Sequence, residues 1–394
     1  MNTVLRQQKI TIIAGARTAV GRFNGMYKDL GTAQLGSAAV REALARSSLA
    51  PAEVDEVIMG CIGQVGPESY NARRVALGAG LPQQTTAFNV NRLCGSGLQA
   101  VFSAAQSLAV GATQVVVAGG NESMTNMPYL DYSGGQGRSL APRTLQHGTL
   151  AMLTDPFSNQ HMGTTADAVA ARYGVPREEQ DEFALGSQRR ADTATAREVF
   201  TQEILGATLI GGAAADRDEH PRPTVSRESL AGLKPAFSPE GTATAGNSSG
   251  VNDGAAALVL ARGEYVRERG MPALATVEHV VVTAMEPGLM GYAPTFALRK
   301  LFADTGLGPG DIDVFELNEA FAAQAVAVIR DAKLEAEKVN PYGGAIALGH
   351  PVGATGAILA LRAAMDLARR DLEFAVVSLC IGGGQGIAML LKRA

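Results

Sequence analysis

The sequence predicts an α/β protein built from two similar halves, with a segment of different character inserted between them. Short apolar runs alternate with helical apolar patterns toward both ends of the chain, which is typical of a sheet covered by helices on both faces. Stretches of the two ends also resemble each other, which indicates a duplication. The chain has 394 residues, more than one simple core holds, so two or three domains are expected.

The repeat is visible in the order of the elements. Each half begins with a helix-to-strand connection, continues through a Val-Asn pair into a helix, and ends in an apolar run followed by glycines. The corresponding segments are residues 51–59 and 309–317, Val90-Asn91 and Val339-Asn340, and residues 115–120 and 375–383. An earlier strand is expected at residues 10–14, where the chain is continuously apolar apart from one threonine.

The residues between the halves contain turn-rich stretches and isolated helices. The clearest helix is expected to begin near Pro176, because Arg177, Glu178 and Glu179 form a good first turn. We therefore interpret this part as an inserted loop domain rather than as another repeat. The expected divisions are an N-terminal half of residues 1–120 plus about 250–272, a loop domain of residues 121–249, and a C-terminal half of residues 273–394.

The composition excludes several classes of protein. Hydrophobic residues make up 46% of the chain, charged residues 18%, and the formal net charge is −4. A chain without a basic excess is not expected to bind nucleic acid, although a few local cations can hold a small phosphorylated ligand. Three cysteines in so long a chain form no disulfide framework and indicate a reducing compartment. We see no signal peptide or membrane-spanning stretch, so we expect a cytoplasmic protein that binds no membrane.

Cys94 is the leading candidate for a catalytic residue. It lies beside Gly95 and Gly97 and directly before a helical apolar pattern. The N-terminus of a helix favours an anion, so we expect this thiol to ionise readily and to act as a nucleophile. The alternative is a small buried hydrophobe, which is how most free cysteines behave. The pattern that predicts the helix consists of Leu98, Val101, Phe102, Ala105, Leu108 and Ala109.

A second cysteine and a histidine also lie beside glycines. Cys380 ends an apolar run and is followed by three glycines, and His350 lies between Gly349 and Pro351. Imidazole can take a proton from a thiol near neutral pH, so the three residues together suggest covalent catalysis on a carbonyl. The alternatives are a core cysteine at the end of a strand and a structural histidine. We interpret four further residues as structural: Cys61, His147, His220 and His279.

Two other patterns favour structural roles on local sequence alone. Asn318 and Glu319 lie where a strand gives way to a helix, and both residue types suit a helix start. Residues 382–386 are rich in glycine, but residues 387–391 resemble a strand, whereas a dinucleotide-binding loop must lead into a helix. No phosphate-binding Gly-Lys-Ser/Thr loop and no clustered metal ligands are evident, so we expect neither a metal nor a permanently bound cofactor.

Taken together, these motifs resemble those of the thiolases, the acetyl-CoA acetyltransferase or 3-ketoacyl-CoA thiolase group. The resemblance covers nearly the whole chain, and so many motifs in order are highly specific. The motifs that carry the resemblance are Gly15–Thr18, Asn91–Gly97, Gly119–Met124, His161–Ala166, Thr244–Gly250, Asn318–Phe321, Gly343–Pro351 and Cys380–Gly384.

The resemblance implies duplicated α/β halves in a layered αβαβα fold, with the loop domain covering the active site and binding CoA. It implies reversible thiolytic cleavage of a 3-oxoacyl-CoA, or Claisen condensation of two acyl-CoA molecules such as acetyl-CoA, by a ping-pong mechanism. Cys94 would accept the acyl group, His350 would activate it, and Cys380 would act as acid and base at the α-carbon. Asn318 would position a water in one oxyanion hole with His350, and the backbone N–H groups of Cys94 and Gly382 would form the other.

The same resemblance implies that coenzyme A is substrate and product, held in a groove of the loop domain. The residues expected to line that groove are Leu153, His161, Met162, Arg222, Ser229, Ala245 and Ser249. Met290 and Phe321, together with Met162, would border the acyl pocket. Three bulky side chains there suggest a short acyl group, although ordinary core packing is the alternative for Met290.

Two other functions stay open at this point. A condensing enzyme of the ketoacyl or hydroxymethylglutaryl-CoA synthase type generally pairs its cysteine with two histidines, or with a histidine and an asparagine, so Cys380 argues against it. A non-catalytic acyl-CoA-binding protein would not need Cys94, His350, Cys380 and Asn318 together. Thiolases usually form dimers or tetramers, and we expect a symmetric homo-oligomer.

Overall fold

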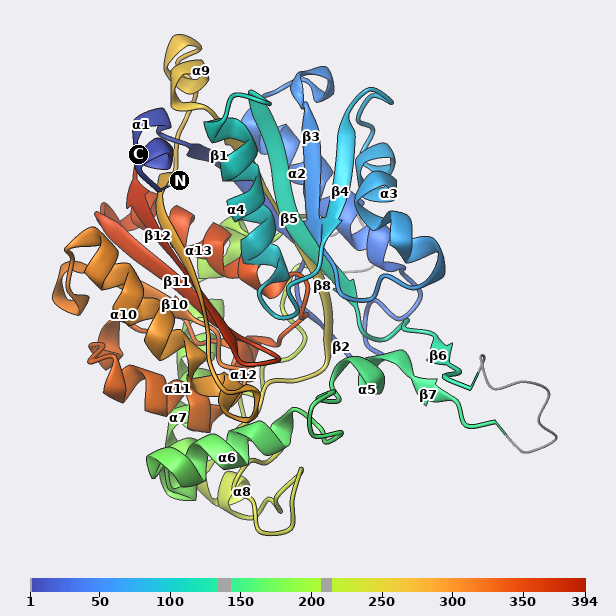
Figure 1. Ribbon diagram of the computed structural model, residues 1–394, viewed down its shortest axis with the longest axis vertical. Helices are drawn as coiled ribbons and strands as arrows, with labels where there is room; N and C mark the ends of the chain where they lie inside the picture. The colour runs from blue at the N-terminus through green and yellow to red at the C-terminus, as the bar shows by residue number, and fades with distance from the viewer. Residues whose placement is uncertain (1, 134–142, 207–214) are drawn as a thin grey trace.

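Ten strands form one mixed sheet in the computed structural model, which describes residues 2–133, 143–206 and 215–394 (Figure 1). Among the same residues, β6 (Tyr129–Leu130) and β7 (Gln146–His147) pair with each other only. The strands of the large sheet are β1 (Thr11–Arg17), β2 (Gly21–Arg22), β3 (Glu56–Gly60), β4 (Thr86–Val90), β5 (Val115–Ser123), β8 (Asn252–Ala261), β9 (Ala275–Ala284), β10 (Val314–Leu317), β11 (Phe374–Ile381) and β12 (Gln385–Arg393).

The sheet repeats one arrangement of strands in its two halves. In the first half, β5 pairs in parallel with β3 and antiparallel with β8, and β8 pairs antiparallel with β1. In the second half, β11 pairs in parallel with β10 and antiparallel with β12, and β12 pairs antiparallel with β9. The halves join where Thr11 and Ile12 of β1 pair with β9. This shared topology confirms the duplication that the sequence indicates.

Helices cover both faces of each half of the sheet. None of the helices in the described part of the chain is both long and apolar enough to cross a membrane. The helices are α1 (Asn2–Gln8), α2 (Thr32–Ser47), α3 (Asn71–Gly78), α4 (Ser96–Ala109), α5 (Gly148–Met152), α6 (Gly163–Tyr173), α7 (Arg177–Ala196), α8 (Arg227–Ala231), α9 (Gly263–Glu268), α10 (Ala293–Thr305), α11 (Ala322–Asp331), α12 (Ala345–Leu348) and α13 (Thr355–Arg370).

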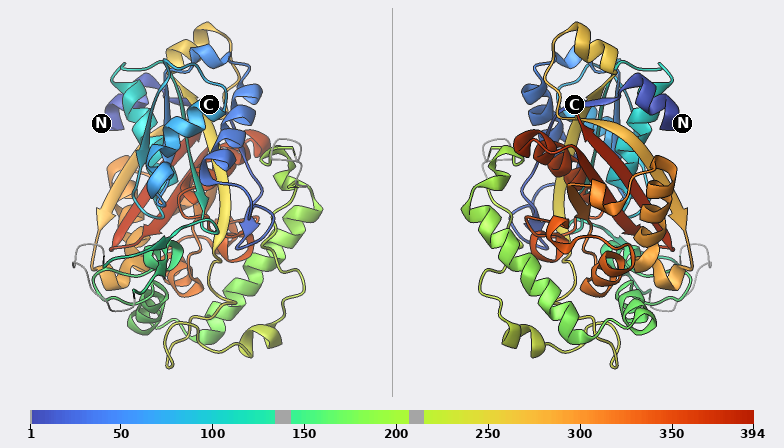
Figure 2. Two further views of the ribbon diagram at one scale, coloured as in Figure 1. Left: turned by 90° about the vertical axis from the view of Figure 1, so that its right-hand side faces the viewer. Right: turned by 90° about the vertical axis from the view of Figure 1, so that its left-hand side faces the viewer.

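The two halves of the sheet and these helices make five layers. Helices α4 and α13 form the middle layer, and their apolar side chains share one core cluster with strands of both halves. Helices α2 and α3 cover the outer face of the first half, and α10 and α11 cover the outer face of the second (Figures 1 and 2). The order αβαβα confirms the fold that the resemblance implies.

The two helices of the middle layer touch through their backbones. A Cβ on Gly97 of α4 would lie 2.7 Å from the backbone nitrogen of Ala357, and one on Gly356 of α13 would lie 2.4 Å from that of Leu98. Side-chain carbons do not approach a backbone so closely, so glycine is what permits this contact. Because the contact is at the first turn of both helices, it also brings together the chain segments that precede them.

The inserted segment joins β5 to β8 and contains α5, α6, α7 and α8. Figure 2 shows its green and yellow-green helices at one end and along one side of the layered body. Helix α7 begins at Arg177, directly after Pro176, which confirms the helix expected there. Residues 134–142 and 207–214 of the expected loop domain lie outside the described residues.

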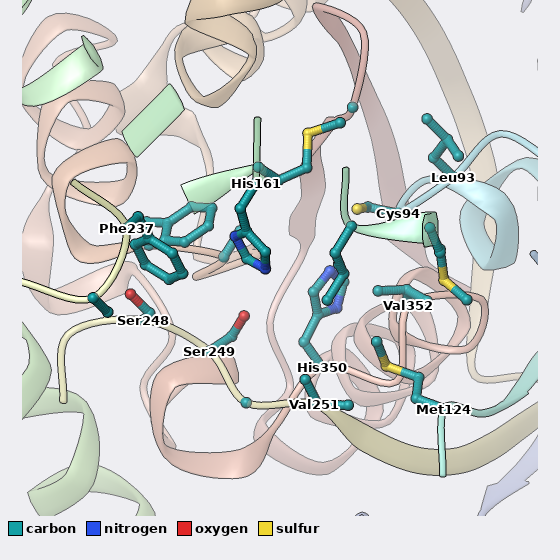
Figure 3. Close-up of a pocket in the computed structure, with 18 of the residues that line it drawn as sticks. Leu93, Cys94, Met124, His161, Phe237, Ser248, Ser249, Val251, His350 and Val352 are labelled. Atoms are coloured by element: carbon teal, nitrogen blue, oxygen red, sulfur yellow. The ribbon is translucent and has the colours of Figure 1, made fainter. Parts of the chain in front are cut away.

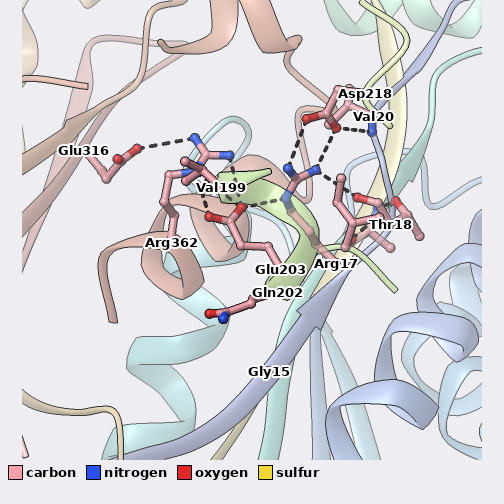
Figure 4. A network of polar contacts seen from close by, with 12 residues as sticks. Gly15, Arg17, Thr18, Val20, Val199, Gln202, Glu203, Asp218, Glu316 and Arg362 are labelled. Carbon is pink, nitrogen blue, oxygen red and sulfur yellow. Dashed lines mark hydrogen bonds and ion pairs between the residues drawn. The ribbon is translucent and has the colours of Figure 1, made fainter. Parts of the chain in front are cut away.

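A buried network of ion pairs connects the inserted segment to both halves (Figure 4). Arg17 of β1 binds Glu203 and Asp218 at 2.8 and 2.7 Å. Arg362 of α13 lies 3.3 Å from Glu203 and 3.6 Å from Glu316 of β10. All five side chains are at most 4% exposed. Removing one partner of a buried ion pair costs about 3–5 kcal/mol, so this network holds the inserted segment firmly against the halves.

Candidate active site

Cys94 lies in the sharp turn between β4 and α4, where it lines a cavity (Figure 3). The residue before it, Leu93, has a φ of 47°, in the left-handed region that branched side chains rarely adopt. The residue after it, Gly95, is the N-cap of α4, and a Cβ there would lie 2.6 Å from Cδ1 of Ile381. The strained turn is what directs the thiol into the cavity.

The Cys94 thiol is not acidic in the free protein. Burial raises its pKa to about 11, although the backbone N–H groups of Gly382 and of Cys94 itself act to lower it. The expectation that the helix N-terminus makes this thiol ionise readily is therefore wrong for this state, because loss of hydration outweighs the nearby donors. Near neutral pH Cys94 is a neutral thiol that needs a base before it can act as a nucleophile.

His350 lies before α13 in a tight segment that requires glycine at position 349. Gly349 has a φ of 97°, and a Cβ there would lie 2.7 Å from Cγ of Asn252. The backbone N–H of His350 donates to Oδ1 of Asn252 at 2.9 Å. The ring Nδ1 lies 2.6 Å from Oγ1 of Thr355, whose hydroxyl donates to the carbonyl of Pro351 at 3.0 Å. Since that hydroxyl proton is already used, Nδ1 is the protonated nitrogen and Nε2 is the nitrogen that can accept a proton or a hydrogen bond.

Asn318 is the side chain beside Nε2 of His350. Its Nδ2 lies 3.4 Å from Nε2 of His350, and its backbone N–H donates to the carbonyl of Ser378 at 2.9 Å. Its Oδ1 is buried and has no hydrogen-bond partner among the described residues. The N-cap of α11 is Phe321, so the capping role that the local pattern favours for Asn318 is wrong. Burial lowers the pKa of His350 to about 4, which leaves the ring neutral near neutral pH.

Cys380 lies near the end of β11 and is fully buried. Burial raises its pKa, and a thiolate at Cys94 raises it further. Cys380 itself does not line the cavity, but it packs in an apolar cluster with residues that do. Those residues are Met162, Phe237, Met290, Ala320 and Phe321. Cys380 is therefore a neutral thiol directly behind the cavity wall and close to Cys94.

The cavity has a volume of about 330 Å³ and is lined by both halves and by the inserted segment. Cys94, His350 and Gly382 lie along it, among mostly apolar side chains. A concave, mainly apolar site with a few converging polar groups is typical of small-molecule binding. The structure thus brings residues from distant parts of the chain to one place where a small acyl group can meet a thiol, an imidazole and backbone donors.

All but one of the residues expected to contact CoA and the acyl group line this cavity. The exception is Ser229, which is exposed on α8, where its hydroxyl donates to the carbonyl of Ser226 at 2.9 Å. The residues in the lining are Leu153, His161, Met162, Arg222, Ala245, Ser249, Met290 and Phe321. Their contacts with a ligand stay predictions.

His161 and Phe237 form a stacked pair in the cavity wall. Their ring centroids are 4.8 Å apart and the ring planes differ by 11°. Nδ1 of His161 accepts the backbone N–H of Gly163 at 3.0 Å, which places the ring proton on Nε2. Burial lowers the pKa of His161, so the stack presents a neutral N–H donor to a ligand beside an aromatic face.

Several of the residues that line the cavity were not predicted from the sequence. Leu93 lies within the motif Asn91–Gly97, and Val352 directly follows the motif Gly343–Pro351, so the motifs could have identified both. Phe237 follows a Lys-Pro-Ala stretch with no periodicity or motif to mark it, and it reaches the cavity only through tertiary packing. The motifs also contain four lining residues that were not singled out, namely Met124, Ser248, Gly250 and Ala320. The remaining lining residues not anticipated are Ile62, Met152, Ala236 and Val251.

Comparison with known protein families identifies the family to which this chain belongs. The sequence model described as "Thiolase, N-terminal domain" matches residues 10–264, and that described as "Thiolase, C-terminal domain" matches residues 271–393. The chain belongs to the thiolase family. Among its relatives, the beta-ketothiolase BktB of Cupriavidus necator is 42% identical over 98% of this chain and 99% of that protein. An acetyl-CoA acetyltransferase of Allochromatium vinosum is 39% identical with the same coverage.

Solved thiolase structures agree with this assignment. The acetyl-CoA acetyltransferase of Bacillus anthracis superposes with a TM-score of 0.95 at 39% identity, covering 98% of this chain and 99% of that one. Human mitochondrial 3-ketoacyl-CoA thiolase, solved in complex with CoA, also has a TM-score of 0.95, at 37% identity and 99% coverage of both chains. This thiolase is an enzyme, an acyltransferase, and the comparisons favour neither a condensing synthase nor a non-catalytic binding protein.

Labelling of Cys94 by iodoacetamide is expected to rise steeply with pH in this thiolase. The thiolate is the reactive form, and below a pKa of about 11 its fraction grows about tenfold per pH unit. Cys94 lines the cavity, whereas Cys61 and Cys380 are buried and do not, so Cys94 should be labelled first and acetyl-CoA should protect it. Peptide mass spectrometry measures the rate at each pH. A rate that levels off near the ordinary thiol pKa of about 8.5 would contradict the effect of burial.

Proposed function

We propose that this thiolase transfers an acyl group between CoA thioesters through a covalent intermediate on Cys94. The observation that supports this most directly is the convergence of Cys94, His350 and the backbone of Gly382 on one cavity. The complex of human mitochondrial 3-ketoacyl-CoA thiolase with CoA supports CoA as substrate and product here. An acyl-enzyme divides one difficult exchange into two easier steps.

In the first half-reaction, the sulfur of Cys94 attacks the thioester carbonyl carbon while its proton passes to Nε2 of His350. The carbonyl electron pair moves to the oxygen and then returns as the bond to the CoA sulfur breaks. With pKa values of about 11 for Cys94 and about 4 for His350, proton transfer before the attack is strongly unfavourable. The proton therefore moves as the new carbon–sulfur bond forms, which is general base catalysis.

Two sets of donors would stabilise the oxyanions. The backbone N–H groups of Cys94 and Gly382 already act on the Cys94 sulfur, so they are directed at the place where a carbonyl bonded to that sulfur develops charge. His350, once protonated, would donate from Nε2 to the second oxyanion, together with a water that Asn318 positions. Loss of one preorganised donor of this kind typically costs about 3–4 kcal/mol of barrier.

Cys380 would carry out the two proton transfers that Cys94 and His350 do not, one to the CoA sulfur and one from the α-carbon. The departing CoA sulfur needs a proton, and Cys380 is a neutral thiol near the cavity that can supply it. The resulting Cys380 thiolate then removes a proton from the α-carbon of a second acetyl-CoA, and the carbanion attacks the acyl group on Cys94. The Cys94 sulfur leaves and recovers its proton from His350, so every proton returns to its starting place. The reverse sequence cleaves a 3-oxoacyl-CoA.

The loop domain, with its proposed limits at residues 121–249, would hold the CoA. This proposal is supported by the side chains of His161, Arg222 and Ser249, which the segment contributes to the cavity lining. Ser229, on the outer surface of α8, would meet only a part of CoA that extends beyond the cavity. We further propose the divisions 1–120 plus about 250–272 and 273–394 for the two halves, and a homo-oligomer, dimer or tetramer, acting in the cytoplasm.

The preferred substrate is expected to carry a short acyl chain, because Met162, Met290 and Phe321 close the cavity beside Cys380. CoA-dependent cleavage of 3-oxoacyl-CoAs of increasing length, beginning with acetoacetyl-CoA, tests the reaction class and the chain length together. Met290→Ala is expected to raise kcat/KM for the next longer substrates about tenfold relative to acetoacetyl-CoA, since each methylene in such a pocket is worth roughly 10- to 200-fold.

A matched control separates pocket shape from loss of stability. Met59 is fully buried in the outer core of the first half, away from the cavity, so Met59→Ala should destabilise the enzyme without changing the order of substrates. If the unaltered enzyme cleaves long-chain substrates as efficiently as acetoacetyl-CoA, the short-chain assignment is wrong. If it cleaves none of them, the reaction class itself is wrong.

A further inference from the structure

Glu122 is a fully buried carboxylate on β5 that the mechanism above leaves without a role. Its two oxygens accept hydrogen bonds from main chain. Oε2 accepts the N–H of Ile62 at 3.0 Å, and Oε1 accepts the N–H of Gly63 at 2.9 Å. Gly353 packs against the same carboxylate, since a Cβ there would lie 2.5 Å from Oε2, and its backbone N–H acts to lower the pKa of Glu122. One side chain thus contacts two chain segments that are almost three hundred residues apart.

Both segments reach the cavity. Ile62, which follows β3, lines it, and Gly353 comes directly after His350 and Val352, which also line it. The carboxylate fills the space between the two backbones. A Cβ on Gly63 would lie 3.0 Å from Oε1 of Glu122, and one on Gly353 would lie 2.5 Å from Oε2. Glycine on both sides is what lets the carboxylate reach the main chain.

The first of these segments is also fixed to the part of the chain that carries Cys94. The backbone N–H of Cys61 donates to the carbonyl of Val90 at 3.1 Å, and Val90 ends β4 just before the turn that contains Cys94. Glu122 therefore connects the Cys94 side of the cavity to the His350 side. Thr355 contacts Nδ1 of the imidazole, and Asn252 of β8 accepts the backbone N–H of His350.

We propose that Glu122 is a positioning residue for the thiolase reaction: by accepting the N–H groups of Ile62 and Gly63 and packing against Gly353, its carboxylate holds His350 at the distance from Cys94 that proton transfer requires. The proposal rests on the roles proposed above for Cys94 and His350. A displacement of about 1 Å between reacting groups can cost roughly 10²-fold in rate, so a modest shift of either segment would be costly.

The free-energy cost of burying the Glu122 carboxylate supports a specific role for this residue. Burial raises the pKa of Glu122 to about 7 even though the backbone donors oppose the shift. A glutamine of the same shape would avoid the cost of desolvating a charge. Glutamine, however, has only one acceptor oxygen, and its NH2 group would face a backbone N–H. A carboxylate accepts from Ile62 and Gly63 with separate oxygens, whereas an amide would lose one of these two hydrogen bonds.

The test compares Glu122→Gln with Glu122→Asp, which keeps both acceptor oxygens on a shorter side chain. The two measurements are exchange of acetyl groups between acetyl-CoA and labelled CoA, and formation of acetoacetyl-CoA. Glu122→Gln is expected to lower kcat of both reactions in parallel by about 10- to 100-fold, with KM for acetyl-CoA within about twofold of its original value. Glu122→Asp should recover part of the lost kcat.

Glu316→Gln is the matched control, because Glu316 is another buried carboxylate of the sheet but pairs with Arg362. It should lower the free energy of unfolding and leave kcat within about twofold. If Glu122→Gln does not fold, Gly353→Ala, which displaces the carboxylate without removing an oxygen, should produce the same parallel loss. Unchanged kcat in a folded Glu122→Gln or Gly353→Ala enzyme, or loss of condensation alone, would overturn the proposal. Exchange that persists in Cys94→Ala would instead refute the proposed function.

Discussion

Replacing Cys94 by Ala is expected to abolish exchange of acetyl groups between acetyl-CoA and free CoA. Cys94 is the only thiol among the described residues that line the cavity, so the acyl-enzyme is not expected to form without it. The loss in kcat should be on the order of 10⁴-fold or more, as for removal of other covalent nucleophiles. Exchange is measured by the transfer of isotope from labelled CoA into acetyl-CoA.

Binding must be measured in the same variant. Alanine is smaller than cysteine and removes only the sulfur, so the cavity keeps its shape and the Kd for CoA should stay within about twofold, as expected when only an interaction of the transition state is lost. Calorimetric titration of CoA measures this. Exchange that continues at the original rate, with CoA bound normally, would show that the nucleophile is a different residue.

Replacing Cys380 by Ala or Ser is expected to suppress carbon–carbon bond formation while leaving acyl transfer to Cys94 detectable. Without Cys380 the CoA sulfur can still leave as a thiolate, so the first step is slowed but not blocked, whereas no residue remains to remove the proton from the α-carbon of acetyl-CoA. Loss of a general base typically costs about 10²- to 10⁴-fold. Production of acetoacetyl-CoA should fall by that factor while the acetylated enzyme accumulates.

Comparing Cys380→Ser with Cys380→Ala separates loss of the thiol from a change in the shape of the buried side chain. Serine preserves the shape of the buried side chain, but its hydroxyl is far less acidic than a thiol, so it should lose condensation as completely as alanine does. Intact-mass spectrometry reports the acetylated enzyme, and ultraviolet absorbance reports acetoacetyl-CoA. If either variant condenses acetyl-CoA at the original rate, Cys380 does not transfer the proton.

Repeated local patterns made much of the fold predictable. The apolar spacing after Cys94 predicts α4, and the strand-like run after Gly386 predicts β12 and correctly excludes a dinucleotide-binding loop. The duplication predicts a helix after the Val-Asn pair of each half, and α4 and α12 are the helices that follow. Chain segments that repeat adopt the same local structure and pack in the same way, so their pairing follows from the pattern.

Features that depend on the tertiary surroundings of a residue were harder to predict from the sequence. The local pattern places Cys94 near a helix start but says nothing of its burial, which raises the pKa of the thiol to about 11. Asn318 has the sequence of a helix cap, yet α11 starts later and the side chain contacts His350 instead. Phe237 reaches the cavity only because the inserted segment folds back over it. Each of these properties is set by residues far away in the sequence.

The most direct measurement is the mass of the enzyme after it is mixed with acetyl-CoA and quenched in acid, followed by mapping of the modified peptide. We predict one acetyl group per chain, carried by the peptide that contains Cys94 and removed when free CoA is added before the quench. Turnover with no such adduct, or an adduct confined to another residue, would contradict this prediction.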